Sequence, residues 1–414
     1  MNATPFLINL PTASVAEAIK SIGADDASLP IFNAKSEILP IKITDIRTPA
    51  ANIIKQELLS AGGDAVTPRG CVNCAVATCS ILMLATARQY RRLAAKIAAM
   101  PYFGLPVISQ QLQDMLKQLA PANDQQKQEA APLTTLADGR TITYEQMAVM
   151  GIINVTPDSF FSGSRVNDEE LLIATAEKML QDGAIILDLG AESTRPGSAS
   201  IDGEEERRRL IPAVRLIHER FPEAIISVDT YRADTAREAL AAGAHIINDI
   251  SAMEKDPNMA DLVVESGAPI ILMHMRGTPA DMMNAENTSY DNITDQVTQY
   301  LVQRAEILTA RGVGKDKIIL DPGIGFAKNT EQNLTLIRNL RSLTAYGYPV
   351  LLAASRKTVI GQVLGGLPPE ERLEGTVATS CAAVYAGAHM VRVHDVAANC
   401  RAIRVTEAIL SGKI

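Results

Sequence analysis

Eight short apolar segments rich in isoleucine, valine and leucine recur through the last two thirds of this 414-residue chain. They span residues 148–155, 184–190, 224–230, 245–251, 269–275, 317–323, 349–355 and 389–395. Amphipathic stretches of helical length separate them, and several end at glycine, as helices often do. Continuous apolar strands that alternate with helices form parallel sheets with a covered outer face. Eight such units predict a closed (β/α)8 TIM barrel, and a doubly wound open sheet is the alternative because it uses the same units.

The chain before the barrel has a different pattern. Residues 14–23, 51–63 and 87–100 carry apolar residues at helical spacing, whereas residues 41–46 resemble a short strand. A polar, glutamine-rich segment flanked by proline then marks a boundary. We therefore expect an α/β barrel preceded by a smaller α+β domain. The predicted parts are an accessory domain of unknown function over residues 1–120, a linker over 121–140 and the barrel over 141–414.

Composition and charge narrow the class of protein. The chain has 47% hydrophobic and 21% charged residues, which is typical of a globular protein. The net charge of −8 argues against a general nucleic-acid or membrane surface. No apolar run approaches the roughly 18 residues of a membrane span, and the N-terminus lacks the pattern of a signal peptide. We expect a cytoplasmic protein that binds neither nucleic acid nor membrane.

The segment CVNCAVATC places Cys71, Cys74 and Cys79 close together in the chain. A metal or redox site is one interpretation. However, no fourth ligand lies near these thiols, and the first histidine is His218. Cysteine beside alanine and valine is often a small buried residue, and we favour that structural interpretation.

A group of arginines lies in the same part of the chain, at Arg69, Arg88, Arg91 and Arg92. They have the charge for an anion site. A charged helix face is usually just solvated, and we favour that interpretation.

Polar residues end nearly every predicted barrel strand. In this order along the chain they are Asn154, Asp188, Asp229, Asn248, His274, Asp321, Ser355, Lys357, Arg392 and His394. Taken singly, an aspartate at a strand end often caps the next helix, and a lone histidine is often structural. Because the C-terminal ends of all barrel strands open onto one face, the set together indicates a binding site.

The chemistry of this set suggests two kinds of ligand. Asp229, Asn248, Asp321 and Lys357 offer acceptors and donors that suit a flat heterocycle with amino, ring N–H and carbonyl groups.

The second kind of ligand is an anion. Arg392 and His394 alternate along the last strand and point the same way, so with Arg195 they suit a phosphate or pyrophosphate. Asn154 and Asp158 are oxygen ligands near the same rim and suit Mg²⁺ shared with phosphate oxygens. The glycine-containing loops TPDSFFSGSR and ESTRPGSAS are polar enough to fold over such a substrate.

Seven motifs carry a family resemblance over about residues 148–410. They are NVTPDSF (154–160), ESTRPGS (192–198), SVDT (227–230), INDIS (247–251), DPGIGF (321–326), SRK (355–357) and RVHD (392–395). The barrel portion resembles the dihydropteroate synthase family of pterin-binding TIM barrels, in which these motifs occur in the same order.

The resemblance implies a transferase of folate biosynthesis. Its reaction joins 6-hydroxymethyl-7,8-dihydropterin pyrophosphate to p-aminobenzoate and gives 7,8-dihydropteroate and pyrophosphate, with Mg²⁺ as cofactor. The catalytic residues implied are Asp229, Lys357, Arg392 and His394. The residues implied to bind the pterin are Asp229, Asn248, Asp321 and Lys357. Arg392 and His394 are implied to hold the pyrophosphate, and Asn154 the metal ion.

The p-aminobenzoate site is implied to comprise Thr194, Arg195 and Pro196 of the mobile loop, with Thr358 near the carboxylate. The family also implies a homodimer formed by barrel helices away from the mouth, for which ATSCAAVYAG is a candidate surface, and sulfonamide binding. Two departures are visible: the first loop reads FFSGSR where many members have Ser-Asp-Gly-Gly, and AASRK lacks the glycine that often precedes the serine.

We expect Lys357→Ala and Arg392→Ala to lower activity while leaving the fold intact.

Two other functions are alternatives to this one. A methyltransferase on a related barrel binds a methylated folate and a corrinoid partner, but it has no evident use for a pyrophosphate clamp at Arg392 and His394. A non-catalytic pterin-binding protein is favoured only if principal site residues are missing, and none is.

Overall fold

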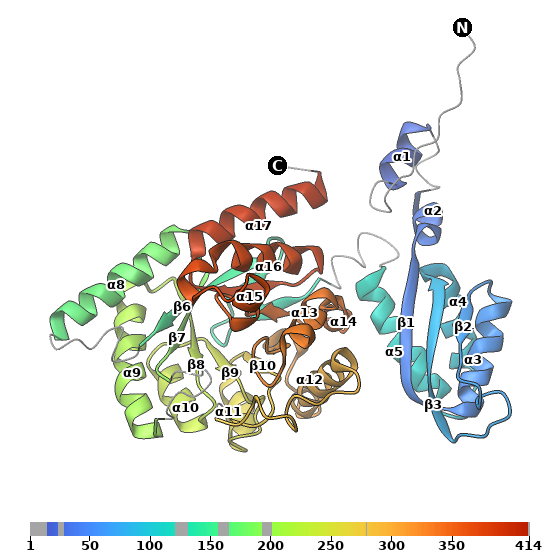
Figure 1. The fold of residues 1–414 in the computed structure, drawn as a ribbon, viewed down its shortest axis with the longest axis horizontal. Coiled ribbons are helices and arrows are strands. Elements are labelled where there is room, and N and C mark those ends of the chain that lie inside the picture. The colour runs from blue at the N-terminus through green and yellow to red at the C-terminus, as the bar shows by residue number, and fades with distance from the viewer. Residues whose placement is uncertain are drawn as a thin grey trace, which may run out of the picture. The chain divides into compact units, whose positions relative to one another are not determined.

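The computed structural model describes residues 15–23, 29–120, 131–155, 165–192, 201–278 and 280–412. The chain divides into two units, Met1–Ala131 and Pro132–Ile414, and both are drawn in Figure 1. Within the described ranges, no helix combines the length and apolarity needed to cross a bilayer.

The first unit is built on a three-stranded antiparallel sheet in the order β1-β3-β2. Its strands are β1 (Ile38–Arg47), β2 (Asp64–Val66) and β3 (Thr78–Thr86). Side chains alternate between the two faces of a strand, so Leu39, Ile41, Ile81 and Met83 all lie on one buried face. These residues form the core of the unit with the apolar faces of its helices.

The helices of this unit are α1 (Val15–Ser21), α2 (Leu29–Ser36), α3 (Thr48–Ser60), α4 (Ala87–Ala98) and α5 (Leu105–Leu119). Both α3 and α5 have proline in the first turn, where its missing N–H costs nothing. Helix α4 begins at a capping box between Thr86 and Gln89. The predicted helices and strand of this region are present.

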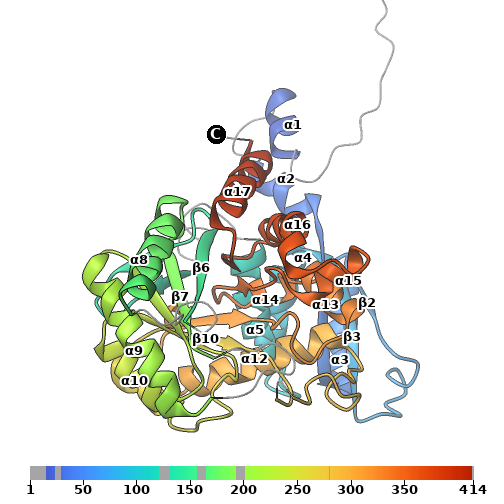
Figure 2. The same cartoon turned by 60° about the vertical axis from the view of Figure 1, so that its left-hand side comes forward.

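The second unit is a barrel of eight parallel strands (Figures 1 and 2). The strand order is β11-β10-β9-β8-β7-β6-β13-β12, and a parallel bridge between Leu320 and Val350 closes the barrel. The strands are β6 (Ala148–Asn154), β7 (Ile186–Gly190), β8 (Ile225–Asp229), β9 (Ile246–Asp249), β10 (Ile270–Met273), β11 (Ile318–Asp321), β12 (Leu351–Leu352) and β13 (Met390–Val393). The prediction of a TIM barrel is confirmed, and the open sheet is excluded because the end strands meet.

Helices surround the barrel, as the view in Figure 2 shows. They are α8 (Arg165–Gln181), α9 (Gly203–Arg220), α10 (Ala233–Ala241), α11 (Met259–Ser266), α12 (Ile293–Thr309), α13 (Thr330–Arg338), α14 (Arg341–Thr344), α15 (Thr358–Val363), α16 (Leu373–Tyr385) and α17 (Val396–Ser411). Two short 3-10 helices, Lys315–Lys317 and Pro369–Glu371, complete the described elements.

A hairpin closes the N-terminal end of the barrel. Strands β4 (Leu133–Thr135) and β5 (Thr141–Thr143) pair with each other. Leu136 and Ile142 pack against an inner layer of the barrel, with which they share one hydrophobic cluster. The members of that layer are Ala148, Met150, Ile186, Ile246, Ile271, Ile319, Leu351 and Met390. The linker expected at residues 121–140 lies partly outside the described residues, and its last part, from Leu133, belongs to this hairpin.

The strand repeat explains why polar groups point into the barrel. Side chains two positions apart share a face, so the next inward residue after each layer residue lies closer to the mouth. Asp188, Asn248, Asp321 and Arg392 occupy these positions, two residues beyond Ile186, Ile246, Ile319 and Met390. The apolar floor and the polar mouth are therefore consecutive layers of the same strands.

Candidate active site at the mouth of the barrel

Arg392 lies at the centre of a network in the barrel mouth. Its Nε donates to Asp188 Oδ2 at 2.6 Å, and its Nη2 donates to Asp229 Oδ2 at 2.9 Å. Asn248 Nδ2 donates to the same oxygen of Asp188 at 3.2 Å. Four side chains from strands β7, β8, β9 and β13 are thus joined by charge-assisted hydrogen bonds.

Burial sets the ionisation of this network. It raises the pKa of Asp229 to about 7; the charge of Arg392 opposes this rise, and that of Asp188 adds to it. Burial also disfavours the Arg392 cation, but Asp188 and Asp229 outweigh it and raise the pKa of Arg392. The site therefore holds a permanent cation beside a carboxyl group that titrates near neutrality.

Asp188 also has an unused acceptor. Among the described residues its Oδ1 is buried without a hydrogen-bond partner, and so is the Oγ of Ser227. The two residues are register partners on β7 and β8. An unpaired buried oxygen is costly, so these atoms indicate a place for a polar ligand. Sequence reasoning put Asp188 at the mouth but gave it no role, although it lies two residues beyond the inward-facing Ile186.

Lys357 and Asp321 form a second part of the site, around the loop after β11. Lys357 Nζ donates to the carbonyl oxygen of Ile324 and lies 4.7 Å from the ring centroid of Phe326. The N–H of Gly323 donates to Asp321 Oδ1 at 2.8 Å. Burial lowers the pKa of Lys357 to about 8 and raises the pKa of Asp321, and each charge opposes the other's shift.

Glycine is required at one point of this loop. Gly325 has φ +84°, and an added Cβ there comes within 3.1 Å of Lys357 Cδ. A larger residue there is therefore strained by the backbone conformation and requires the lysine side chain to shift.

Lys328 was not predicted from the sequence as a site residue. Its ammonium group contacts backbone carbonyl oxygens of the same loop. Its side chain is 2% exposed. Nζ lies 2.8 Å from the carbonyl oxygen of Phe326, 3.0 Å from that of Gly323 and 3.1 Å from that of His274, and 3.0 Å from His274 Nδ1. Burial holds the pKa of Lys328 well below its ordinary value. The available signal was a lysine directly after the apolar, glycine-containing loop DPGIGFA.

The turn after β12 aims Lys357 into the site. Arg356 has φ +56°, a left-handed conformation that is uncommon for a non-glycine residue. Two hydrogen bonds to Asp395, of 2.9 and 2.7 Å, hold its guanidinium group. Its backbone N–H donates to Thr376 Oγ1 at 3.0 Å, and its carbonyl accepts from Arg372 at 2.8 Å. The middle residue of the SRK motif therefore shapes the turn.

The remaining expected site residues lie around the rim. His394 Nδ1 is 3.0 Å from Ser355 Oγ, which joins the ends of β13 and β12. Thr358 is exposed at the start of α15. Asn154 is half-buried at the end of β6, in register with Gly190. Asp158, Thr194, Arg195 and Pro196 lie outside the described residues.

The described donors limit how a metal ion is held. Across the described ranges, no three His, Cys, Asp or Glu side chains are grouped so as to hold a metal ion. Mg²⁺ usually keeps several waters and takes one or two protein oxygens beside substrate phosphates. The amide oxygen of Asn154 fits that shared mode, whereas an all-protein cage does not fit these residues.

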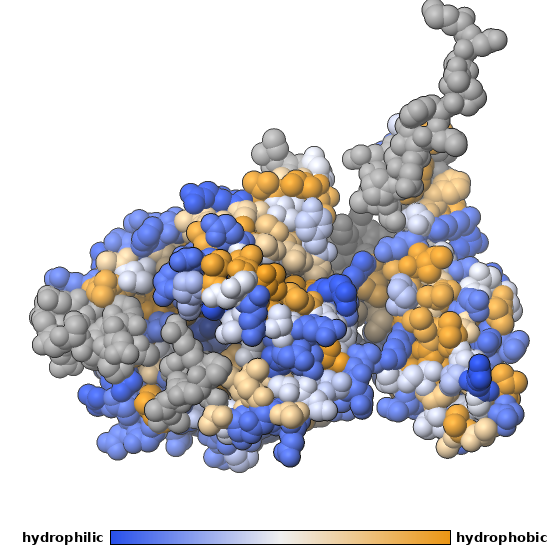
Figure 3. All heavy atoms as spheres, viewed as in Figure 1, coloured by the Kyte–Doolittle hydropathy of each residue, from blue (hydrophilic) through white to orange (hydrophobic). Residues whose placement is uncertain are grey.

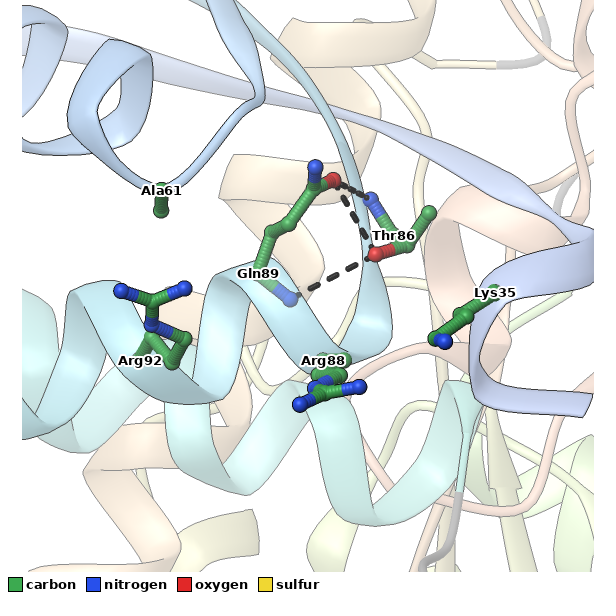
Figure 4. A pocket seen from close by; sticks show the side chains of 6 residues that line it. All are labelled: Lys35, Ala61, Thr86, Arg88, Gln89 and Arg92. Atoms are coloured by element: carbon green, nitrogen blue, oxygen red, sulfur yellow. Dashed lines mark hydrogen bonds between the residues drawn. The ribbon is translucent and has the colours of Figure 1, made fainter. Parts of the chain in front are cut away.

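The first unit contains a basic cavity of about 310 Å³, shown in Figure 4. Its lining residues are Lys35, Ala61, Thr86, Arg88, Gln89 and Arg92. Arg88 and Arg92 are exposed one turn apart on α4, whereas Arg91 donates to the carbonyl of Ala120. The cavity brings two of the expected arginines together with Lys35. Their exposure agrees with a solvated helix face.

Fold and site together define a class of protein: a (β/α)8-barrel enzyme whose mouth is built to hold a polar heterocycle beside a cation. The family model described as pterin binding enzyme matches residues 150–394. The chain belongs to this family, and within it to the dihydropteroate synthases.

Three similar proteins illustrate the relationship. The dihydropteroate synthase of Synechocystis is 43% identical over 275 residues, which cover 66% of this chain and 93% of that one. The structure of the Yersinia pestis enzyme with a sulfonamide drug has a TM-score of 0.62 and 38% identity, and covers 68% of this chain and 100% of that one. That of the Xanthomonas albilineans enzyme with 4-aminobenzoic acid has a TM-score of 0.62 and 38% identity, over 67% and 98% of the two chains.

Proposed function

We propose that this chain condenses 6-hydroxymethyl-7,8-dihydropterin pyrophosphate with p-aminobenzoate, giving 7,8-dihydropteroate and pyrophosphate. The observation that carries the proposal is the Arg392 network, which combines a half-buried cation, two carboxylates and an amide at the mouth of a pterin-binding barrel. The match to dihydropteroate synthases along nearly their whole length supports the same reaction.

The pterin ring is proposed to lie over the polar layer. Asp229, Asn248 and Asp321 offer acceptors and a donor for the amino, ring N–H and carbonyl groups. Asp188 Oδ1, which lacks a partner among the described residues, is a further acceptor for a ring N–H. Lys357, whose Nζ also donates to the carbonyl oxygen of Ile324, is proposed to donate to an acceptor of the ring.

In the proposed reaction the bond between the pterin methylene carbon and the pyrophosphate oxygen breaks first, and the oxygen keeps the electron pair. Arg392 and His394 are proposed to hold the departing anion, and ionised Asp229 and Asp321 to stabilise the positive charge left on the ring system. The aniline nitrogen then attacks the methylene carbon and loses a proton. Bound Mg²⁺, with Asn154 as its described ligand, would neutralise charge on the leaving group.

The p-aminobenzoate site is proposed to comprise Thr194, Arg195 and Pro196, with Thr358 at the carboxylate. Thr358 is exposed at the first position of α15, directly after Lys357. The Yersinia pestis enzyme binds a sulfonamide drug, and we propose that this chain does so as well.

We further propose a cytoplasmic homodimer. Val405 and Ile409 on α17 and Tyr385 on α16 are more than 60% exposed. Figure 3 shows apolar side chains gathered over α17 and around α15 and α16. Apolar patches of this kind often mark interfaces.

A direct assay tests the function. The purified full chain with Mg²⁺ and both substrates is expected to release one pyrophosphate for each dihydropteroate formed. Omitting p-aminobenzoate should stop dihydropteroate formation. Folded protein that forms no product at saturating substrate would overturn the proposal. Methyl transfer from a methylated folate to a corrinoid, measured in parallel, would point to the alternative enzyme.

A further inference from the structure

The three clustered cysteines of the first unit lie outside the residues matched by the pterin-binding family model. All of them are free thiols. Cys71 is buried in the core of the unit, Cys79 is half-buried on β3, and Cys74 is exposed in the loop between them. The region therefore combines a buried thiol, a partly accessible thiol and an exposed one.

Two of the sulfurs face each other. Cys79 Sγ lies 3.9 Å from Cys71 Sγ, at hydrogen-bond distance for sulfur. A disulfide bond requires a separation of about 2.05 Å, so the sulfurs need to approach by roughly 2 Å. We expect side-chain rotation to bring the sulfurs together, because hydrogen bonds hold the backbone near both cysteines.

The anchors are hydrogen bonds from the start of α3. The N–H of Thr48 donates to the carbonyl of Ala77 at 3.1 Å, close to Cys79. Asn52 Nδ2 donates to the carbonyl of Cys71 at 2.9 Å. The loop from 71 to 78 is thus tied to one helix at both ends, which keeps Cys71 beside Cys79.

Asn52 also lies close to Cys74. The Cys71 thiol lies 3.3 Å from Asn52 Oδ1, whereas Asn52 Nδ2 lies 3.9 Å from Cys74 Sγ. The two sulfurs therefore contact opposite ends of one carboxamide group. Cys74 also has a left-handed backbone, with φ +53°. Cys79 is the neighbour that Cys71 meets directly.

We propose that Cys71 and Cys79 form a thiol–disulfide exchange site whose substrates are low-molecular-weight disulfides. The Cys79 thiolate attacks one sulfur of the small disulfide, whose S–S bond breaks and releases one thiol carrying the proton from Cys79. Cys71 then attacks the Cys79 sulfur of the mixed disulfide and expels the second small thiol with its own proton. Two protein thiols are oxidised, and one disulfide is reduced to two thiols.

The order of attack follows from accessibility. Cys79 is half-buried and Cys71 is fully buried, so Cys79 is the more accessible thiol of the pair. Burial and the neighbouring thiols also raise the pKa of Cys71, which makes it a poor first nucleophile. Once a mixed disulfide forms at Cys79, Cys71 is the adjacent thiol that resolves it.

Oxidised glutathione is the probe for the test, used on the folded full chain, with remaining thiols then alkylated. Of the five free cysteines, two should be lost and three remain. Trypsin releases residues 70–88 as one peptide, because no lysine or arginine lies between Arg69 and Arg88. This peptide should carry one alkyl group, on Cys74, and give no backbone fragments between Cys71 and Cys79. Dithiothreitol should restore all three alkylation sites.

Matched variants separate the possibilities. Cys74→Ser should form the same bridge, whereas Cys79→Ser, altered at the more accessible member, should lose it. In Cys71→Ser, glutathione should remain attached to Cys79. The proposal is overturned if Cys71 and Cys79 are both alkylated in the oxidised wild-type chain, if the bridge involves Cys74, or if glutathione stays on Cys79 when Cys71 is present.

Discussion

Arg392 is the residue on which the mouth of the barrel depends, because it contacts both Asp188 and Asp229. Its position at a strand end suggested that alanine would leave the fold intact. The structure changes this expectation, because removal of the cation leaves the buried carboxylate of Asp188 and the half-buried carboxylate of Asp229 without it. Breaking a buried pair in this way costs about 3–5 kcal/mol.

We therefore expect Arg392→Met to lower kcat/KM by at least about 100-fold and the free energy of unfolding by about 3 kcal/mol. Adding Asp188→Asn should recover part of the stability but none of the activity, because one buried charge is then removed. Urea denaturation and the coupling assay measure the two effects. Unchanged stability in Arg392→Met would show that the network is not a buried ion pair in solution.

We expect two other residues of the site, Asp229 and Lys357, to make stability and activity depend on pH. The pKa of Asp229 is raised from 3.8 to about 7, so its contribution to stability is present below 3.8 and lost as the pH rises through about 7. The pKa of Lys357 is lowered from 10.5 to about 8, so its contribution is present above 10.5 and lost as the pH falls through about 8. Ionised Asp229 and charged Lys357 coexist best between these values.

We expect kcat/KM to rise with pH up to about 7 and to fall above about 8. Lys357→Arg should lower activity but remove the fall on the alkaline side, because a guanidinium group stays charged. The full pH profile of each protein provides the test. An alkaline limb that stays in place in Lys357→Arg would assign it to another group.

At the scale of elements, the turn between β12 and α15 depends on the ion pair between Arg356 and Asp395. This ion pair positions Lys357, a candidate catalytic residue. Arg356 is held in a left-handed conformation that costs about 1–2 kcal/mol for an ordinary residue. Asp395, the N-cap residue of α17, holds its guanidinium with two hydrogen bonds. Strand end and helix start are thus linked, and Lys357 follows directly.

We expect Asp395→Asn to lower kcat/KM about 10-fold through displacement of Lys357, with a smaller change in Tm. Asp261→Asn is the matched control, since it removes an ion pair of 2.6 Å with Arg311 on the outer helices, and exposed pairs contribute little. Equal activity of the Asp395 and Asp261 variants would mean that the turn holds its shape without Asp395.

At the scale of the whole molecule, the position of the barrel unit's N-terminal boundary determines whether a truncated chain keeps its stability and activity. Sequence composition put the start of the barrel at residue 141. The barrel unit also includes β4, which precedes that residue and pairs with β5. Leu136, next to β4, and Ile142, in β5, are 1% and 3% exposed and pack against the inner layer. Lys317 Nζ and the Leu136 carbonyl, 3.1 Å apart, join the hairpin to the barrel.

We expect a chain of residues 132–414 to keep the coupling activity, whereas residues 145–414 should lose at least about 3 kcal/mol of stability, because the apolar layer is uncovered. Thermal denaturation and the coupling assay on both proteins make the comparison. Equal Tm values would show that the hairpin is dispensable. Reduced activity of the longer chain would assign a role to the first unit.

The barrel and the polar composition of its mouth could be predicted from the sequence, because eight apolar segments and the polar residues that end them follow a strict order along the chain. The C-terminal ends of barrel strands open onto one face, which was enough to predict that Asp229, Asn248, Asp321 and Arg392 lie together. The contacts between side chains depend on the tertiary structure, since Asp188 and Arg392 are hydrogen-bonded although they lie 204 positions apart in the chain. The same holds for Lys328, whose partners come from two strand ends, and for Cys71 and Cys79, whose separation depends on the packing of α3. Periodicity is a local property, whereas contacts and burial depend on how distant segments close on one another.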